Sequence, residues 1–219
     1  MTKQTKITIA SILFLIVTII DVYAVIVQDK TLEMIFKPLL MTTLVIIYLV
    51  SVKKPNFWLV SALFFSFWGD VFLLDKTNYF VFGLGSFLIA HCLYIVMTKQ
   101  FLKKFNFKEL LICFPPFAMI FLGVLQFIKH NLGEMLIPVI VYGLVISVFG
   151  AFALLNYRQE RTTPNMWLLL GAVLFIASDS LIAINNFYSP KQLFNVLIVV
   201  LYILSQYLIV KAVIKKTIK

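Results

Sequence analysis

The amino-acid sequence predicts an all-α integral membrane protein with eight transmembrane helices. Hydrophobic residues make up 62% of the 219 residues and charged residues only 13%, a balance that ordinary soluble domains do not show. The mean hydropathy is +1.02. The apolar residues also gather in long stretches that are separated by short, charged connections. Together these observations indicate a chain whose main solvent is lipid.

The length of each apolar stretch predicts one helix. A helix rises about 1.5 Å per residue, so about 20 apolar residues cross a hydrocarbon layer about 30 Å thick. We therefore expect helices at residues 7–27, 32–52, 57–74, 79–98, 109–128, 134–155, 165–187 and 191–213. The connections between them are too short for a soluble domain, so residues 1–219 are expected to form a single polytopic membrane domain.

The basic residues predict the orientation of these helices. If the chain crosses eight times, fourteen of the 19 basic residues fall on one side, namely Lys3, Lys6, Lys53, Lys54, Lys99, Lys103, Lys104, Lys108, Arg158, Arg161, Lys211, Lys215, Lys216 and Lys219. An excess of lysine and arginine marks the cytoplasmic side of a membrane. Both termini are therefore expected on the cytoplasmic side, and the membrane is expected to be a bacterial inner membrane. The net charge of +10 then reflects topology, and no nucleic-acid partner is expected.

Few ionisable side chains lie inside the predicted helices, and each carries a cost of about 2.5–3.5 kcal/mol on insertion scales. They are Asp21, Lys37, Asp70, His91 and Asp179, and most fall in the outer half of the membrane. Asp70 and Asp179 are the strongest candidates for a functional site, although either carboxylate could instead pair with Lys37 or reach the lipid headgroups. For Asp21, a position at the solvated outer rim is as consistent with the sequence as a functional role. For His91, a structural hydrogen bond to a neighbouring helix is equally consistent. Tyr202 and Gln206 are interpreted as packing residues with interhelical hydrogen bonds.

A weak similarity links the third and seventh predicted helices. Each has an apolar run followed by a small residue and an aspartate, Gly69-Asp70 in one and Ser178-Asp179 in the other. An offset of four helices preserves orientation in the membrane. This pattern favours a 4+4 parallel repeat that would bring the two aspartates face to face at equal depth.

An ordered set of short stretches resembles the YhhN family, which includes the transmembrane lysoplasmalogenases. The resemblance covers the second to the eighth predicted helix, whereas the first contributes little. The stretches that carry it are Lys37-Pro38-Leu39-Leu40, Gly69-Asp70, Gly83-Leu84-Gly85, His91-Cys92-Leu93-Tyr94, Tyr142-Gly143, Ser178-Asp179-Ser180 with Asn185, and Leu201-Tyr202 with Gln206.

The resemblance implies a hydrolase that cleaves the vinyl ether bond of lysoplasmalogens, giving a fatty aldehyde and glycerophosphoethanolamine or glycerophosphocholine. This chemistry needs an acid to protonate the β-carbon and a carboxylate beside the resulting oxocarbenium ion. We assign Asp70 and Asp179 jointly as general acid and base. Lys37 is a candidate for binding the lipid phosphate, with neutralisation of an aspartate as the alternative. Candidates for positioning water or substrate are His91, Tyr94, Tyr142 and Asn185.

Two other functions fit the same features. Paired intramembrane carboxylates in a repeated bundle also suit a small proton-coupled transporter, and a third reading is a lipid-binding membrane protein without turnover. The expected partners are a lysophospholipid substrate and membrane lipid. No cofactor and no metal are expected, because the acids and His91 show no ligand spacing typical of a metal site.

Overall fold

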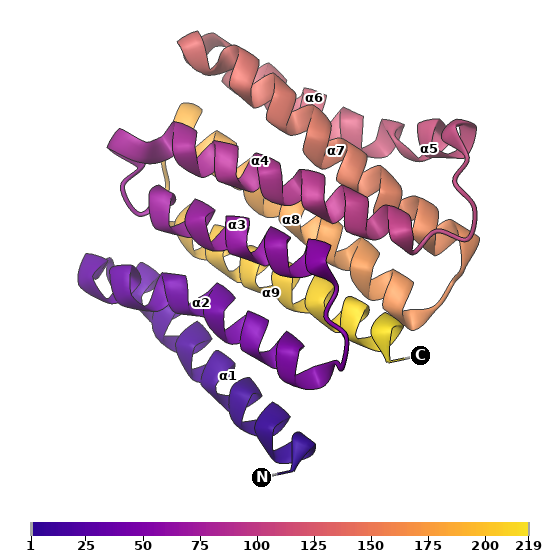
Figure 1. Ribbon diagram of the computed structural model, residues 1–219. Coiled ribbons are helices and arrows are strands. Elements are labelled where there is room, and N and C mark those ends of the chain that lie inside the picture. The colour runs from indigo at the N-terminus through magenta and orange to yellow at the C-terminus, as the bar shows by residue number, and fades with distance from the viewer. Residues whose placement is uncertain (1, 219) are drawn as a thin grey trace.

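The computed structural model describes residues 2–218, and over that range it contains α-helices and short 3-10 turns but no strands (Figure 1). The helices are α1 (Lys3–Val27), α2 (Lys30–Ser51), α3 (Phe57–Leu73), α4 (Lys76–Gln100), α5 (Phe107–Cys113), α6 (Pro115–Ile128), α7 (Leu136–Gln159), α8 (Thr163–Phe187) and α9 (Gln192–Thr217). Two 3-10 turns, Lys129–Asn131 and Gly133–Met135, connect α6 to α7. Lys219, one of the basic residues assigned to the cytoplasmic side, lies outside the described residues.

The helices confirm the all-helical, membrane-integrated class. Six of them within the described residues, α1, α2, α4, α7, α8 and α9, are long and apolar enough to cross a bilayer. The α5–α6 pair raises the number to as many as seven if it is counted as one span, and α3 is an apolar helix of 17 residues. Each of the eight stretches expected from hydropathy is thus helical, but the number of crossings stays a prediction.

The fifth expected helix, residues 109–128, is wrong as a single straight element. The chain forms α5 and α6 instead, with their axes bent by 43°. Pro115 and Pro116 explain the break, because each lacks the N–H that would continue the helical ladder and their rings disfavour a helical residue before them. The same residues are well suited to the first turn of α6, where those N–H groups would have no partner.

Close helix contacts hold the bundle together. A Cβ added to Gly69 of α3 would lie 2.5 Å from the Phe87 ring of α4, so any larger residue would force the ring or the helices to shift. At Gly171 of α8, an added Cβ would lie 3.0 Å from the Ser205 carbonyl oxygen of α9. Small residues serve the same purpose in other membrane helices. The α3–α4 and α8–α9 pairs are therefore tightly packed, and they carry Asp70 and Asp179, respectively.

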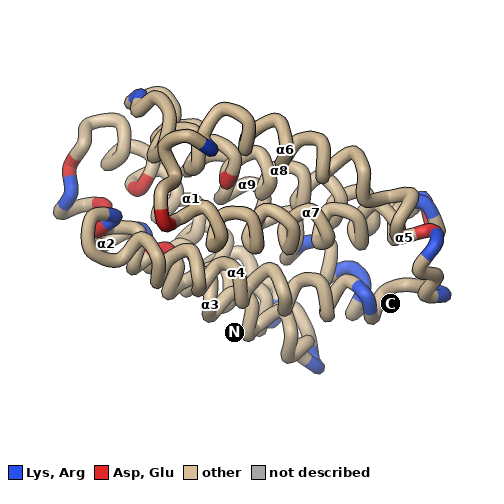
Figure 2. Tube along the Cα trace, turned by 90° about the horizontal axis from the view of Figure 1, so that it is seen from above, with Lys and Arg blue, Asp and Glu red and all other residues tan. Residues whose placement is uncertain are grey.

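The two ends of the chain lie at the same end of the bundle (Figure 1). Lysine and arginine prevail at the end where the C-terminus lies, whereas most acidic residues gather at the other end (Figure 2). The basic residues that the sequence analysis assigned to one side of the membrane thus account for much of the positive charge at one end of the bundle.

Candidate functional site

Asp179 of α8 is contacted by polar groups from two other helices. The Tyr142 hydroxyl of α7 donates a hydrogen bond to Asp179 Oδ2. The Nε2 atom of His91 on α4 lies 3.9 Å from the same carboxylate oxygen. The His91 ring is fully buried and the Asp179 side chain is 10% exposed. Three helices therefore converge on one nearly buried carboxyl group.

The hydrogen bonds of His91 decide how a proton is held at this site. Nδ1 lies 2.7 Å from the Phe87 carbonyl oxygen, which can only accept, so Nδ1 is the donor. A neutral imidazole protonated at Nδ1 leaves Nε2 as an acceptor, and this atom has no hydrogen-bond partner. It faces the Asp179 carboxylate, which is also an acceptor. Because 3.9 Å exceeds hydrogen-bond distance, the two acceptors are close but not bonded to each other, and a proton on either group would lie beside the other.

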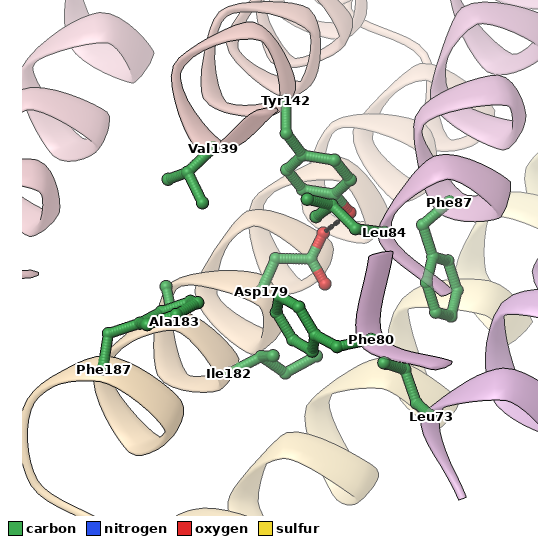
Figure 3. Close-up of a pocket in the computed structure, with 10 residues that line it drawn as sticks. All are labelled: Leu73, Phe80, Leu84, Phe87, Val139, Tyr142, Asp179, Ile182, Ala183 and Phe187. Carbon is green, nitrogen blue, oxygen red and sulfur yellow. Dashed lines mark hydrogen bonds between the residues drawn. The ribbon is translucent and has the colours of Figure 1, made fainter. Parts of the chain in front are cut away.

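Two small cavities, each of about 50 Å³, flank Asp179. The first lies between α3, α4, α7 and α8, and its lining of Phe80, Leu84, Phe87 and other apolar side chains surrounds the carboxyl group (Figure 3). The second lies on the α6 side of α7 and shares with the first Val139, Tyr142, Asp179 and Ala183. Since roughly 10–15 Å³ is enough to hold a water molecule, either cavity has room for water beside the acid.

Asp70 of α3 has a separate polar partner. It is 6% exposed, and its Oδ2 accepts a hydrogen bond of 2.8 Å from the Tyr202 hydroxyl of α9. It lines neither of the two cavities at Asp179. The two aspartates, which the repeat was expected to bring face to face, thus have separate polar partners, each with its own tyrosine.

One aromatic cluster lies between His91, near Asp179, and Tyr202, the partner of Asp70. The Phe175 ring lies 4.5 Å from the His91 ring and 5.5 Å from the Tyr202 ring, measured between centroids. Phe87 also contacts Tyr202, at 5.8 Å.

The tyrosine partners of the two aspartates do not follow the expected repeat. Tyr142 comes from the sixth expected helix and Tyr202 from the eighth, and these two helices are not equivalent in a 4+4 repeat. The repeat therefore stays a prediction.

Tyr94 lies outside the Asp179 cavities, in a hydrogen-bonded chain of its own. Its hydroxyl donates to Gln206 Oε1 at 2.5 Å, and Gln206 Nε2 donates to Ser66 Oγ at 3.1 Å. This chain joins α4, α9 and α3 and is fully buried. The structure thus gives Tyr94 an interhelical role.

Asn185 is used by the connection between α8 and α9. Its amide donates to Asn195 Oδ1 at 2.8 Å, and its own oxygen accepts from the Lys191 backbone N–H at 2.7 Å. These bonds fix the turn that leads into α9. Asn185 therefore stabilises the loop near the site and does not contact Asp179 through any of these bonds.

Lys37 of α2 is half-buried and lies close enough to Asp70 and Asp21 to interact with both electrostatically. It forms no ion pair with either one among the described residues, so its ammonium group is not committed to a single aspartate. Asp21 is fully buried, and neither carboxylate oxygen has a hydrogen-bond partner in residues 2–218. The alternative of a solvated rim position for Asp21 is wrong, because the face of α1 that carries it packs into the bundle.

The sequence did not single out Tyr202 as the direct partner of Asp70. The expected interhelical hydrogen bonds of Tyr202 and Gln206 are confirmed, but the identity of the acceptor was not foreseen. A signal was present, because the two polar side chains lie four residues apart and so share one face of an otherwise apolar helix. In the described part of the chain, no three His, Cys, Asp or Glu side chains lie close enough together to hold a metal ion.

Comparison with known proteins gives one family match and two similar proteins. The YhhN family model matches residues 32–213. Proteins named lysoplasmalogenase from Mycobacterium bovis and Mycobacterium tuberculosis are each 33% identical to this chain over 141 residues, which is 62% of this chain and 52% of theirs. The chain thus matches about half the length of these relatives. No solved structure matches. Asp70, His91, Tyr142 and Asp179 all lie within the family match, whereas Asp21 precedes it.

Proposed function

The chain belongs to the YhhN family, and from this premise we propose that it is a lysoplasmalogenase-like hydrolase of the membrane. Its substrate is a lysophospholipid with a vinyl ether chain. The observation that carries the proposal is an acid, Asp179, that accepts a hydrogen bond from Tyr142 and lies near His91, beside an apolar cavity with room for water. The names of the mycobacterial relatives support the same substrate class.

The first step is proton transfer to carbon. The proton of the Asp179 carboxyl group passes to the β-carbon of the vinyl ether, and the double-bond electrons form the new C–H bond. The α-carbon and the ether oxygen then share the positive charge of an oxocarbenium ion. The Asp179 carboxylate left by this transfer stabilises that cation in a site of low dielectric constant.

The second step consumes water. A water molecule in the Asp179 cavity adds to the α-carbon and returns one proton to the His91–Asp179 pair, which restores the acid. The hemiacetal then collapses, its hydroxyl proton going to the departing glycerol oxygen. The products are a fatty aldehyde and glycerophosphoethanolamine or glycerophosphocholine, and one water is used in each turnover.

Asp70 and Lys37 take supporting parts in this scheme. Asp70 is the second carboxylate of the pair, and its charge acts on the developing cation from behind the aromatic cluster because it does not line the Asp179 cavities. Lys37 has no fixed aspartate partner, so its ammonium group is available for the lipid phosphate. The alkenyl chain would lie against the apolar lining that includes Phe80 and Leu84.

We further propose eight crossings, with α3 and the bent α5–α6 pair added to the six long helices, and cytoplasmic termini in a bacterial inner membrane. The basic residues at the end of the bundle where the C-terminus lies support this orientation (Figure 2). Reporter fusions at Lys30 and Lys129 should give an outer-side signal, and a fusion at Lys53 a cytoplasmic one. A cytoplasmic signal from both Lys30 and Lys129 would contradict the proposed topology.

Aldehyde release by the purified protein in detergent tests the activity. Asp179→Asn should lower kcat by about 10²- to 10⁴-fold, the usual contribution of a general acid, while lysolipid binding persists. The matched control is Asp75→Asn, which makes the same change at an exposed residue that caps α4 and should keep wild-type turnover. A wild-type protein that binds lysoplasmalogen and releases no aldehyde would refute the hydrolase proposal.

A further inference from the structure

A larger cavity, apart from the two at Asp179, opens at the end of the bundle where the chain termini lie. Its volume is about 570 Å³, and it lies between the first turns of α1, the last turns of α2 and the last turns of α9. Trp167, at the edge of this region, precedes Asp179 by twelve residues on α8, about 18 Å along the helix axis at 1.5 Å per residue. None of the candidate catalytic residues lines this cavity.

Positive charge defines the rim of this cavity. Lys3 of α1 and Lys211 of α9 line it, and no acidic residue does. The Lys211 ammonium lies over the Trp167 ring at 4.5 Å and the Tyr207 ring at 5.6 Å, measured to the ring centroids. Within residues 2–218, neither lysine forms an ion pair with a carboxylate. Two cations from different helices therefore face one open space without a neutralising anion.

The floor of the same cavity is apolar. Ile47 of α2 and Val210 of α9 are buried there, and Ile214 continues the apolar wall toward the end of α9. Trp167 and Tyr207 are residues of the kind that gather where the hydrocarbon layer meets the headgroups. Lys211 and its two aromatic neighbours thus place the charged rim at headgroup depth and the apolar floor at acyl-chain depth.

We propose that this cavity binds one acidic phospholipid, whose phosphate pairs with Lys3 and Lys211 and whose acyl chain lies against Ile47, Val210 and Ile214. Basic pockets between membrane helices bind anionic headgroups in this way. The two charges explain the preference for an acidic lipid over a zwitterionic one, and the apolar floor explains the preference for a lipid over a free phosphate. The bound lipid bridges α1, which precedes the family match, to α9, which lies mostly within it.

Binding of phosphatidylglycerol to the full-length protein in detergent tests the proposal, with phosphatidylcholine of the same acyl chains as the comparison. The double variant Lys3→Gln/Lys211→Gln should bind phosphatidylglycerol about 30-fold more weakly in native mass spectrometry, because each ammonium near a lipid surface contributes roughly fivefold. Phosphatidylglycerol should also raise the Tm of the wild type and not that of this variant.

The matched control is Lys6→Gln/Lys215→Gln. It also removes one positive charge from α1 and one from α9, but at exposed positions that do not line the cavity, and it should keep wild-type affinity. Equal loss in both double variants would show attraction by net charge alone and would overturn the proposal. Equal affinity for phosphatidylcholine, or full competition by glycerol 1-phosphate, would overturn it as well.

A second measurement does not depend on variants. Photoactivatable phosphatidylglycerol should crosslink to the wild-type protein at peptides from the start of α1 and the end of α9. Crosslinks confined to other helices would contradict the site even if the lysine variants failed to fold.

Discussion

Tyr142→Phe removes one hydroxyl from the wall of the Asp179 cavity and keeps the ring. In the wild type this hydroxyl donates to Asp179 Oδ2, the same oxygen that faces His91 Nε2. Without it, the carboxyl group loses the donor that fixes its orientation and stabilises its ionised form. The proposed mechanism needs that ionised form once the proton has passed to the substrate.

The expected size of the effect follows from this hydrogen bond. A hydrogen bond to a charged group contributes about 1.5–3 kcal/mol, and 1.36 kcal/mol of barrier is a tenfold change in rate. Tyr142→Phe should therefore lower kcat by about 10- to 150-fold. KM should change little, because the hydroxyl contacts the acid and lies in a pocket separate from Lys37.

Tyr202→Phe is the matched comparison. It makes the same change at the hydroxyl that donates to Asp70, which does not line the Asp179 cavities. Its kcat should exceed that of Tyr142→Phe by at least about tenfold, although its thermal stability should fall because a buried carboxyl group loses its donor. Aldehyde release in detergent measures both rates. Equal losses in the two variants, or wild-type turnover by Tyr142→Phe, would refute the assignment of the chemistry to Asp179.

Two further predictions concern Lys37 and Asp21. Lys37→Met should raise KM about tenfold or more with a smaller change in kcat, since a charge-assisted hydrogen bond to phosphate contributes roughly 1.5–3 kcal/mol to binding. Initial rates measured against lysolipid concentration test this prediction, and a loss of kcat with unchanged KM would contradict it. Asp21→Leu should raise the Tm, because both oxygens of this buried carboxyl group lack partners, and replacing such a group by an apolar one of similar shape is worth about 1–3 kcal/mol. A lower Tm would indicate that Asp21 stabilises the fold through Lys37.

The sequence alone determined the membrane class, the helical stretches to within a few residues apart from the break between α5 and α6, and the two aspartates as candidate site residues. It could do so because these properties are local. An apolar stretch of sufficient length must satisfy its backbone within itself, and a charge inside such a stretch is conspicuous wherever the helix packs. The break before Pro115 was also present in the sequence, but the continuous hydropathy from 109 to 128 concealed it.

The tertiary structure decided what each of these side chains touches. Asp179 and Tyr142 are 37 residues apart, and Asp70 and Tyr202 are 132 apart, so no local pattern assigns a tyrosine to either acid. Helix packing likewise placed Asp21 in the interior, turned Asn185 toward the α8–α9 connection, and aimed the free His91 nitrogen at Asp179. Hydropathy fixes the length and depth of a helix, whereas its rotation about its own axis depends on its neighbours, and that rotation decides which polar side chains meet.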